Sequence, residues 1–211
     1  MVALRDAVVL VGGFPLLSGV NLELSPRSLN VVTGANGAGK TSLLRLLGGL
    51  VTLTSGTGVV SGVDLRGDLR ELRRRVGWLG HEGSFYDDLS ASENLVFAAK
   101  ALARPTADVP SVLERVGLSA RTSTPARQLS AGQRRRLGLA WLLLRRPELW
   151  LLDEPYASLD DDGRTFFDQL IGDVVADGAT VVVSAHDPLR SSALAPRTIT
   201  LAGGLVVSDR S

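Results

Sequence analysis

The sequence predicts an α/β fold in which a mostly parallel sheet carries helices on both faces. Continuous apolar runs at residues 29–33, 148–152 and 179–184 alternate with segments of helical periodicity, which is typical of parallel strands buried on both sides. One longer segment, residues 82–147, is mainly helical in pattern. We therefore expect a core built on the sheet and a helical lobe inserted into it.

Composition narrows the class of protein. The chain has 211 residues, a net charge of +1 and no cysteine, so we expect no disulfide framework, no thiolate metal site and no general affinity for nucleic acid. No stretch reaches the roughly 18 apolar residues of a membrane span, and the start MVALRDAVVLVGG is too short and too acidic for a secretion signal. We expect a soluble protein without direct membrane insertion.

The N-terminal part is predicted to form an antiparallel β subdomain. Residues 2–10 and 20–24 alternate between apolar and polar side chains, as edge strands do. The elements expected next are a strand at 29–33, a glycine loop, a helix at 40–50, a turn and short strand within 55–64, and a strand at 76–80.

Three helices are expected in the helical lobe. The first, over residues 90–102, begins with a capping box, Ser90 followed by Glu93. The second covers residues 110–118, and the third starts after Ser130, a good N-cap residue.

The C-terminal part is predicted to return to the core. A helix over residues 163–177 precedes the strand at 179–184, and a hairpin over 198–207 turns at Gly203–Gly204. We thus predict a single domain over residues 1–211, with a core lobe at about 1–81 and 148–211 and a helical lobe at about 82–147.

The segment GANGAGKT, Gly34–Thr41, matches the P-loop pattern, with a strand before it and a helix after it. Glycines let backbone N–H groups curl around phosphate oxygens, and the helix points its positive end at them. Lys40 would reach the β- and γ-phosphates, and the Thr41 hydroxyl would bind Mg²⁺. The alternative is a glycine turn that matches by chance. The predicted phosphate-binding residues are Asn36, Gly37, Ala38, Gly39, Lys40, Thr41 and Ser42.

Two acids end the apolar strand in LWLLDEP, residues 149–155. A carboxylate there is what Mg²⁺ needs beside a P-loop, so Asp153 is a predicted metal ligand, and Glu154 is a candidate general base. His186 follows the strand at 179–184, on the ligand edge of the sheet, where it could contact the γ-phosphate or hold the attacking water. Alone, the acids would indicate a strand-end turn and the histidine a structural residue.

These motifs, with LSAGQ at 129–133 and SLD at 158–160, stand in the order and spacing of ABC-type ATPases, which the whole chain resembles. LSAGQ is the discriminating motif, because other P-loop proteins lack it. The resemblance implies a P-loop NTPase core and an ATPase that uses ATP and Mg²⁺. It also implies a head-to-tail homodimer and a membrane subunit through which transport is powered, on the cytoplasmic, inner face of the cell membrane.

Residue roles follow from the same resemblance. Each LSAGQ helix caps the ATP held by the other copy, and the membrane subunit contacts the surface around His81–Glu93. The residues implied are Lys40, Glu154 and His186 for catalysis, and Ser130, Gly132 and Gln133 for the γ-phosphate across the interface.

Two positions depart from the family pattern. The usual glutamine after the VGWL strand is here His81, a shorter and titratable side chain that by position is a candidate metal ligand with Thr41 and Asp153. The aromatic residue expected to stack on adenine aligns with Val11, with Phe14 nearby. LGHEGSFYDDLSASENLVF and ELWLLDEPYASLD resemble the ATPase subunit of haem export for cytochrome c maturation, where a histidine also replaces that glutamine.

Two other functions are alternatives to that of a transport ATPase. A non-transport ABC ATPase that acts on ribosomes or DNA is the alternative, although such proteins usually carry tandem cassettes, long coiled coils or basic extensions, and none is visible. A P-loop small-molecule kinase does not explain LSAGQ.

Three arginines, Arg134–Arg136, crowd the first turns of the LSAGQ helix, where the helix end is already positive. A solvated helix face is the plain interpretation of such a run. The functional interpretation is an anion brought by the partner copy, with some arginines paired with acids or facing solvent.

Overall fold

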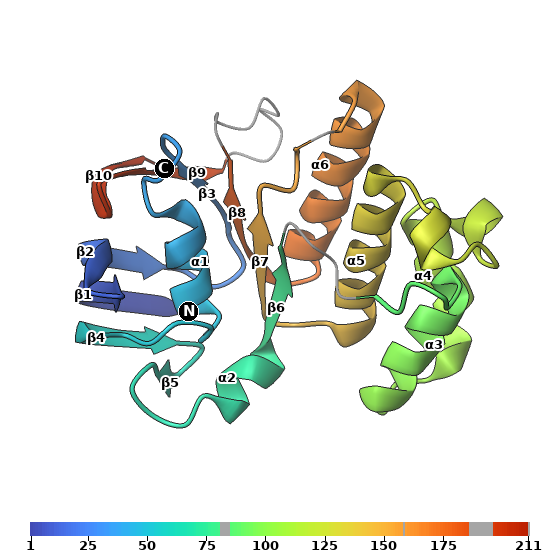
Figure 1. Ribbon diagram of the computed structural model, residues 1–211, viewed down its shortest axis with the longest axis horizontal. Helices are drawn as coiled ribbons and strands as arrows, with labels where there is room; N and C mark the ends of the chain where they lie inside the picture. The colour runs from blue at the N-terminus through green and yellow to red at the C-terminus, as the bar shows by residue number, and fades with distance from the viewer. Residues whose placement is uncertain (81–84, 158, 186–195, 211) are drawn as a thin grey trace.

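The computed structural model describes residues 1–80, 85–157, 159–185 and 196–210, and their strands form two sheets (Figure 1). The smaller sheet has the order β2-β1-β4-β5 and is antiparallel. Its strands are β1 (Val2–Val11), β2 (Phe14–Leu24), β4 (Ser55–Val60) and β5 (Val63–Asp64). The predicted antiparallel β subdomain is confirmed.

The larger sheet has the order β10-β9-β3-β8-β7-β6. Every pairing in it is parallel except that of β9 with β10, so the predicted mostly parallel sheet is also confirmed. Its strands are β3 (Leu29–Thr33), β6 (Val76–Leu79), β7 (Leu149–Asp153), β8 (Thr180–Ser184), β9 (Arg197–Ala202) and β10 (Leu205–Arg210).

Helices cover both faces of the larger sheet (Figure 1). Helix α1 lies between the two sheets, and α5 and α6 lie on the opposite face of the larger one. None of the helices in the described residues is long and apolar enough to cross a membrane. The α-helices are α1 (Lys40–Leu47), α2 (Arg70–Arg75), α3 (Ala91–Ala101), α4 (Val109–Arg115), α5 (Ala131–Arg145) and α6 (Asp161–Ala176).

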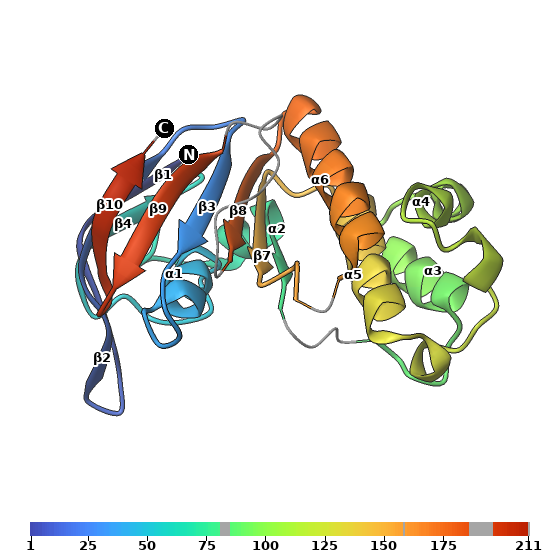
Figure 2. The same ribbon diagram turned by 90° about the horizontal axis from the view of Figure 1, so that it is seen from above.

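Several predicted boundaries were wrong. Strand β2 begins at Phe14 instead of residue 20, because Gly12 and Gly13 both adopt positive φ and form a two-residue turn that pairs Val11 with Phe14. The resulting hairpin projects beyond the rest of the small sheet (Figure 2). Helix α6 begins at Asp161 instead of residue 163, because the Asp160 carboxylate caps it by accepting the N–H of Gly163.

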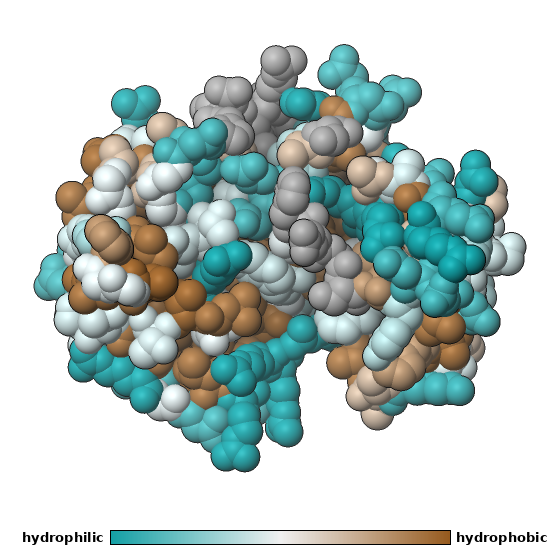
Figure 3. All heavy atoms as spheres, viewed as in Figure 1, coloured by the Kyte–Doolittle hydropathy of each residue, from teal (hydrophilic) through white to brown (hydrophobic). Residues whose placement is uncertain are grey.

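Helix α2 was missed in the prediction. Its sequence RELRRR buries only Leu72, so no apolar stripe marks it as a helix. The molecular surface has an indentation between α2 and the lower end of α3 (Figure 3).

The larger sheet separates two hydrophobic clusters. Along β7, Trp150 and Leu152 point to the cluster that contains α3–α6, while Leu149 and Leu151 point to the cluster around α1 and the small sheet. This alternation explains why the strand is apolar throughout.

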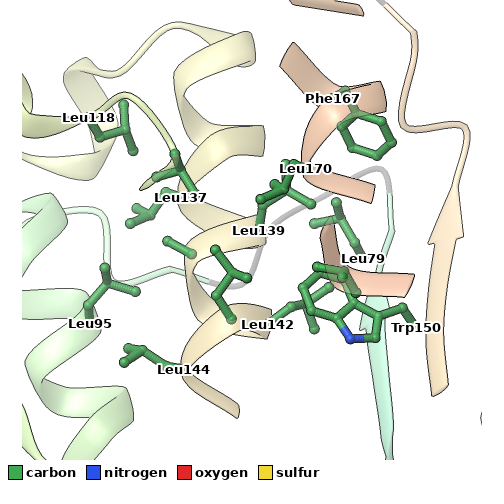
Figure 4. Packing of buried hydrophobic residues seen from close by; sticks show 14 of the residues in the cluster. Leu79, Leu95, Leu118, Leu137, Leu139, Leu142, Leu144, Trp150, Phe167 and Leu170 are labelled. Carbon is green, nitrogen blue, oxygen red and sulfur yellow. The ribbon is translucent and has the colours of Figure 1, made fainter. Parts of the chain in front are cut away.

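Helix α5 joins the helical lobe to the sheet. Leu137 and Leu144 lie on the side of Leu118 and Leu95, whereas Leu142 lies near Trp150 (Figure 4). The apolar cluster is therefore continuous from α3 and α4 to the sheet. The division into two lobes at residues 82–147 stays a prediction.

Candidate functional site

The glycine loop lies between β3 and α1 and is packed too closely for side chains at two positions. A Cβ on Gly34 would come within 2.3 Å of the Leu201 carbonyl oxygen, and one on Gly39 within 2.9 Å of the Leu16 carbonyl oxygen. Both glycines also have positive φ, 144° and 104°. The Gly204 N–H donates to the Ala38 carbonyl at 3.0 Å, so the β9–β10 hairpin holds the loop from outside.

Helix α1 begins without a cap. Its N-cap residue, Gly39, offers no side chain, and the first turn holds no acid. Helices α3, α5 and α6, by contrast, begin at side-chain caps. The first N–H groups of α1 have no partner within the helix, and their dipoles make this end electropositive. The end of the loop is therefore suited to an anion.

The predicted loop residues divide by exposure. Asn36 and Gly37 are exposed, Ala38 and Lys40 are buried, and Gly39, Thr41 and Ser42 are intermediate.

Lys40 is a buried cation held by its own loop. Its side chain is 5% exposed, and Nζ donates to the carbonyl oxygens of Gly34 at 2.8 Å and Ala35 at 3.2 Å. Glu154 Oε1 lies 4.0 Å from the same nitrogen. The charge is thus partnered, as burial requires.

Asp153 ends β7 and meets the loop. Its Oδ1 accepts the Thr41 hydroxyl at 3.1 Å and the Ser184 hydroxyl at 2.6 Å. A carboxylate and a hydroxyl side by side are oxygen donors of the kind that Mg²⁺ prefers. Among the described residues there is no group of three or more acids, histidines or cysteines that could enclose a metal. The donor set fits a cation that completes its shell with phosphate or water.

Glu154 has a fixed and unfavourable backbone. Its φ is 47°, in the left-handed region, which costs a non-glycine residue on the order of 1–3 kcal/mol. Its N–H donates to Ser184 Oγ at 2.8 Å, and its carbonyl accepts from Arg135 Nη1 at 2.7 Å. The side chain stays 33% exposed, so a carboxylate that water can reach stands next to Asp153 and Lys40.

Ser184 and Arg135 were missed in the sequence prediction. Ser184 had a signal, because it is the polar residue at the end of an otherwise apolar strand, TVVVS. Arg135 had none, since it stands in a run of three arginines.

The residues of LSAGQ form the start of α5. Ser130 Oγ accepts the Gln133 N–H at 3.2 Å, and Gln133 Oε1 accepts the Ser130 N–H at 3.0 Å, which makes a capping box. A Cβ on Gly132 would meet no atom within 4 Å. Both segments are described in full, and no hydrogen bond joins residues 130–133 to residues 34–42.

The solvated-face interpretation of Arg134–Arg136 was wrong, because all three are half-buried and bonded within the chain. Arg134 pairs with Asp87 at 2.8 Å. Arg136 donates to the Val116 carbonyl at 3.2 Å and lies over the Phe166 ring. Each arginine of the run therefore has a contact within its own chain.

Five further residues were singled out in the sequence. His81, Ser158 and His186 lie outside the described residues. Val11 and Phe14 flank the turn of the β1–β2 hairpin and are 53% and 76% exposed.

Known proteins resemble this chain over most of its length. Residues 17–157 match the family model described as ABC transporter. The cytochrome c biogenesis ATP-binding export protein CcmA of Rhodopseudomonas palustris is 39% identical over 178 residues, which cover 84% of this chain and 88% of that protein. The protein CcmA 2 of Cupriavidus metallidurans is 42% identical over 187 residues, which cover 88% and 89%.

Solved structures share the fold. An ATP-binding cassette, described as a dimer in a post-hydrolysis state bound to ADP and phosphate, has a TM-score of 0.89 at 24% identity and covers 100% of this chain and 98% of its own. An ATP-binding subunit of an ABC transporter has the same TM-score at 22% identity, covering 100% and 90%.

Proposed function

The chain belongs to the ABC transporter family, and on that premise we propose that it is the ATP-hydrolysing subunit of an exporter that serves cytochrome c maturation. The observation that carries the proposal is the meeting of the loop at residues 34–41 with Asp153 and Glu154 at one edge of the sheet.

The loop and α1 bind the triphosphate. The uncapped first turn of α1 and the Lys40 ammonium neutralise phosphate oxygens, with Asn36–Gly39 and Ser42 lining the cradle. Thr41 and Asp153 would hold Mg²⁺, which would polarise the phosphoryl oxygens when bound. Lys40 can leave the Gly34 and Ala35 carbonyls because phosphate oxygens are stronger acceptors.

Glu154 carries the hydrolytic step. Its exposed carboxylate accepts a proton from the water that attacks the γ-phosphate, and water oxygen bonds to phosphorus as the bond to ADP breaks. Catalysis is then mainly positioning and electrostatics. His186, carried over from the family pattern, stabilises the transferring group, and His81 is a further candidate ligand of the metal. Phe14, the more exposed of the two hairpin residues, packs on adenine.

Two copies pair head to tail around the nucleotides. The support within this chain is the open space at Gly132, where a partner's phosphate can approach the backbone at the positive end of α5. Ser130 and Gln133 complete the contact, and they already shape that helix end through their capping box.

The membrane subunit docks on the surface around His81–Glu93. Tyr86 and Phe97 are 56% and 50% exposed and pack edge to face at 4.9 Å, which gives the surface an aromatic centre. Asn94 makes this centre rigid, because its amide donates to the carbonyls of Tyr86 and Leu89 and accepts the Tyr86 N–H. The chain is thereby held on the cytoplasmic, inner face of the membrane.

Haem is the cargo that we propose. The support is the likeness to proteins named as cytochrome c biogenesis ATP-binding export proteins at about 40% identity over most of the chain. The cargo path lies in the membrane subunit, so this part of the proposal rests on relatedness alone.

Glu154→Gln tests the proposal. We expect the variant to bind ATP, to release phosphate very slowly and to accumulate as a dimer with ATP, measured by light scattering after gel filtration. Glu148→Gln is the matched control, because Glu148 is exposed just before the other end of β7. A monomeric Glu154→Gln variant with full activity would contradict the assignment.

In the organism that encodes the chain, the same substitution should lower the amount of covalently bound haem c. Unchanged haem c would contradict the proposed cargo alone.

A further inference from the structure

We propose that Arg135 is a positioning residue that links helix α5 to Glu154 and fixes the orientation of the Glu154 carboxylate. The inference rests on the proposed function, in which Glu154 accepts the proton from water. It assigns a role to a residue that the phosphate, metal and dimer contacts described above do not use.

Both peptide groups that flank the Glu154 Cα are held from outside. The N–H on one side donates to Ser184 Oγ at 2.8 Å, and the carbonyl on the other accepts from Arg135 Nη1 at 2.7 Å and from the Ala157 N–H at 3.1 Å. Because peptide groups are planar, fixing both of them fixes φ and ψ, and with these the direction of the Cα–Cβ bond. The left-handed φ of 47° needs such support.

Of the three residues that bond to the Glu154 backbone, Arg135 is the one from another layer of the fold. Ala157 belongs to the same turn, and Ser184 belongs to the strand that pairs with β7. Arg135 comes from α5, which lies on a different layer of the fold. Its guanidinium is half-buried: burial lowers its pKa, while the charges of Asp153 and Glu154 act in the opposite direction. A partly desolvated cation therefore interacts with the charges of both acids, and its bond to the carbonyl is charge-assisted.

The neighbouring arginines do not share this role. Arg134 points to Asp87, and Arg136 points to Val116 and the Phe166 ring. Arg135 stands five residues after Ser130, about 7.5 Å along the helix. If the start of α5 receives the partner's nucleotide, a shift of α5 on pairing moves Arg135 and the Glu154 peptide with it. Arg135 thus makes the water-activating carboxylate of one site respond to the nucleotide of the other.

The test compares Arg135→Met, Arg135→Lys and Arg145→Met in the full chain. Arg145 is a matched control, because it also lies half-buried on α5, its pKa is also lowered by burial, and it also donates to a backbone carbonyl, that of Arg73. Misplacing a catalytic group by about 1 Å can cost 10²-fold in rate. We expect Arg135→Met to lower kcat by roughly 10- to 100-fold, with KM, ATP affinity and Tm close to those of Arg145→Met. Arg135→Lys, which keeps the charge but has only one donor nitrogen, should recover part of the loss.

A double-mutant cycle separates a role through Glu154 from a general one. When Arg135→Met is added to Glu154→Gln, the residual rate should not fall further, because the group that Arg135 positions has already been removed. An equal fold loss in both backgrounds, or wild-type kcat in Arg135→Met, would overturn the inference. If Arg135→Met lowers Tm far more than Arg145→Met does, the same cycle is measured with Arg135→Lys, and an equal fold loss in both backgrounds would also overturn the inference. Full activity of Glu154→Gln itself would instead refute the proposed function.

Discussion

Ser184 offers a quantitative test of how the two acids are held. Its hydroxyl donates to Asp153 Oδ1 at 2.6 Å and accepts the Glu154 N–H at 2.8 Å. The residue is 0% exposed, so water cannot easily replace either bond. Ser184→Ala removes the hydroxyl, so the Asp153 carboxylate loses a donor and the Glu154 N–H loses its acceptor.

The expected cost follows from the two bonds. A neutral hydrogen bond contributes about 1 kcal/mol to stability and one to a charged group about 1.5–3 kcal/mol, so Ser184→Ala should lower the free energy of unfolding by about 2.5–4 kcal/mol. In a domain of this size each kcal/mol shifts Tm by about 2–4 °C. The melting temperature should therefore fall by roughly 5–15 °C.

The assay is urea unfolding followed by tryptophan fluorescence, with Thr180→Val as control. Thr180 is equally buried on the same strand, but its hydroxyl accepts only one neutral bond, from the Arg27 N–H at 2.9 Å. The control should cost about 1 kcal/mol. If Ser184→Ala costs no more than Thr180→Val, the bond to the carboxylate does not contribute as argued.

Two further substitutions test the phosphate contacts. Lys40→Ala should abolish tight ATP binding in calorimetry, because the loop loses the cation that its carbonyls hold ready; near-normal affinity would refute the phosphate assignment. Gly132→Asp should abolish ATPase activity but leave folding and nucleotide binding by the monomer intact, since a Cβ added at Gly132 would meet no atom within 4 Å. Loss of monomer binding would mean that this helix end serves its own site.

The sequence predicted those features that neighbouring residues determine together. The glycine loop, the apolar strand before Asp153 and the capping box at Ser90 and Glu93 are short-range patterns, and all were found as expected. The contacts of the arginines could not be predicted from the sequence, because they depend on how α5 packs. This packing brings Arg134 to Asp87 and Arg135 to the Glu154 carbonyl. Helix α2 was out of reach for another reason: tertiary contacts at Leu72 stabilise a segment with no helical periodicity of its own.

The order of strands in the larger sheet decides when this protein can fold during synthesis. Strand β3 is made early, but its two neighbours, β8 and β9, are made about 150 residues later. At about 5–20 residues per second, β3 is synthesised roughly 8–30 s before its partner strands. Throughout that interval the nascent chain contains an apolar strand whose backbone N–H and C=O groups are unpaired on both edges. We therefore expect the nascent chain to bind chaperones that protect unpaired strands.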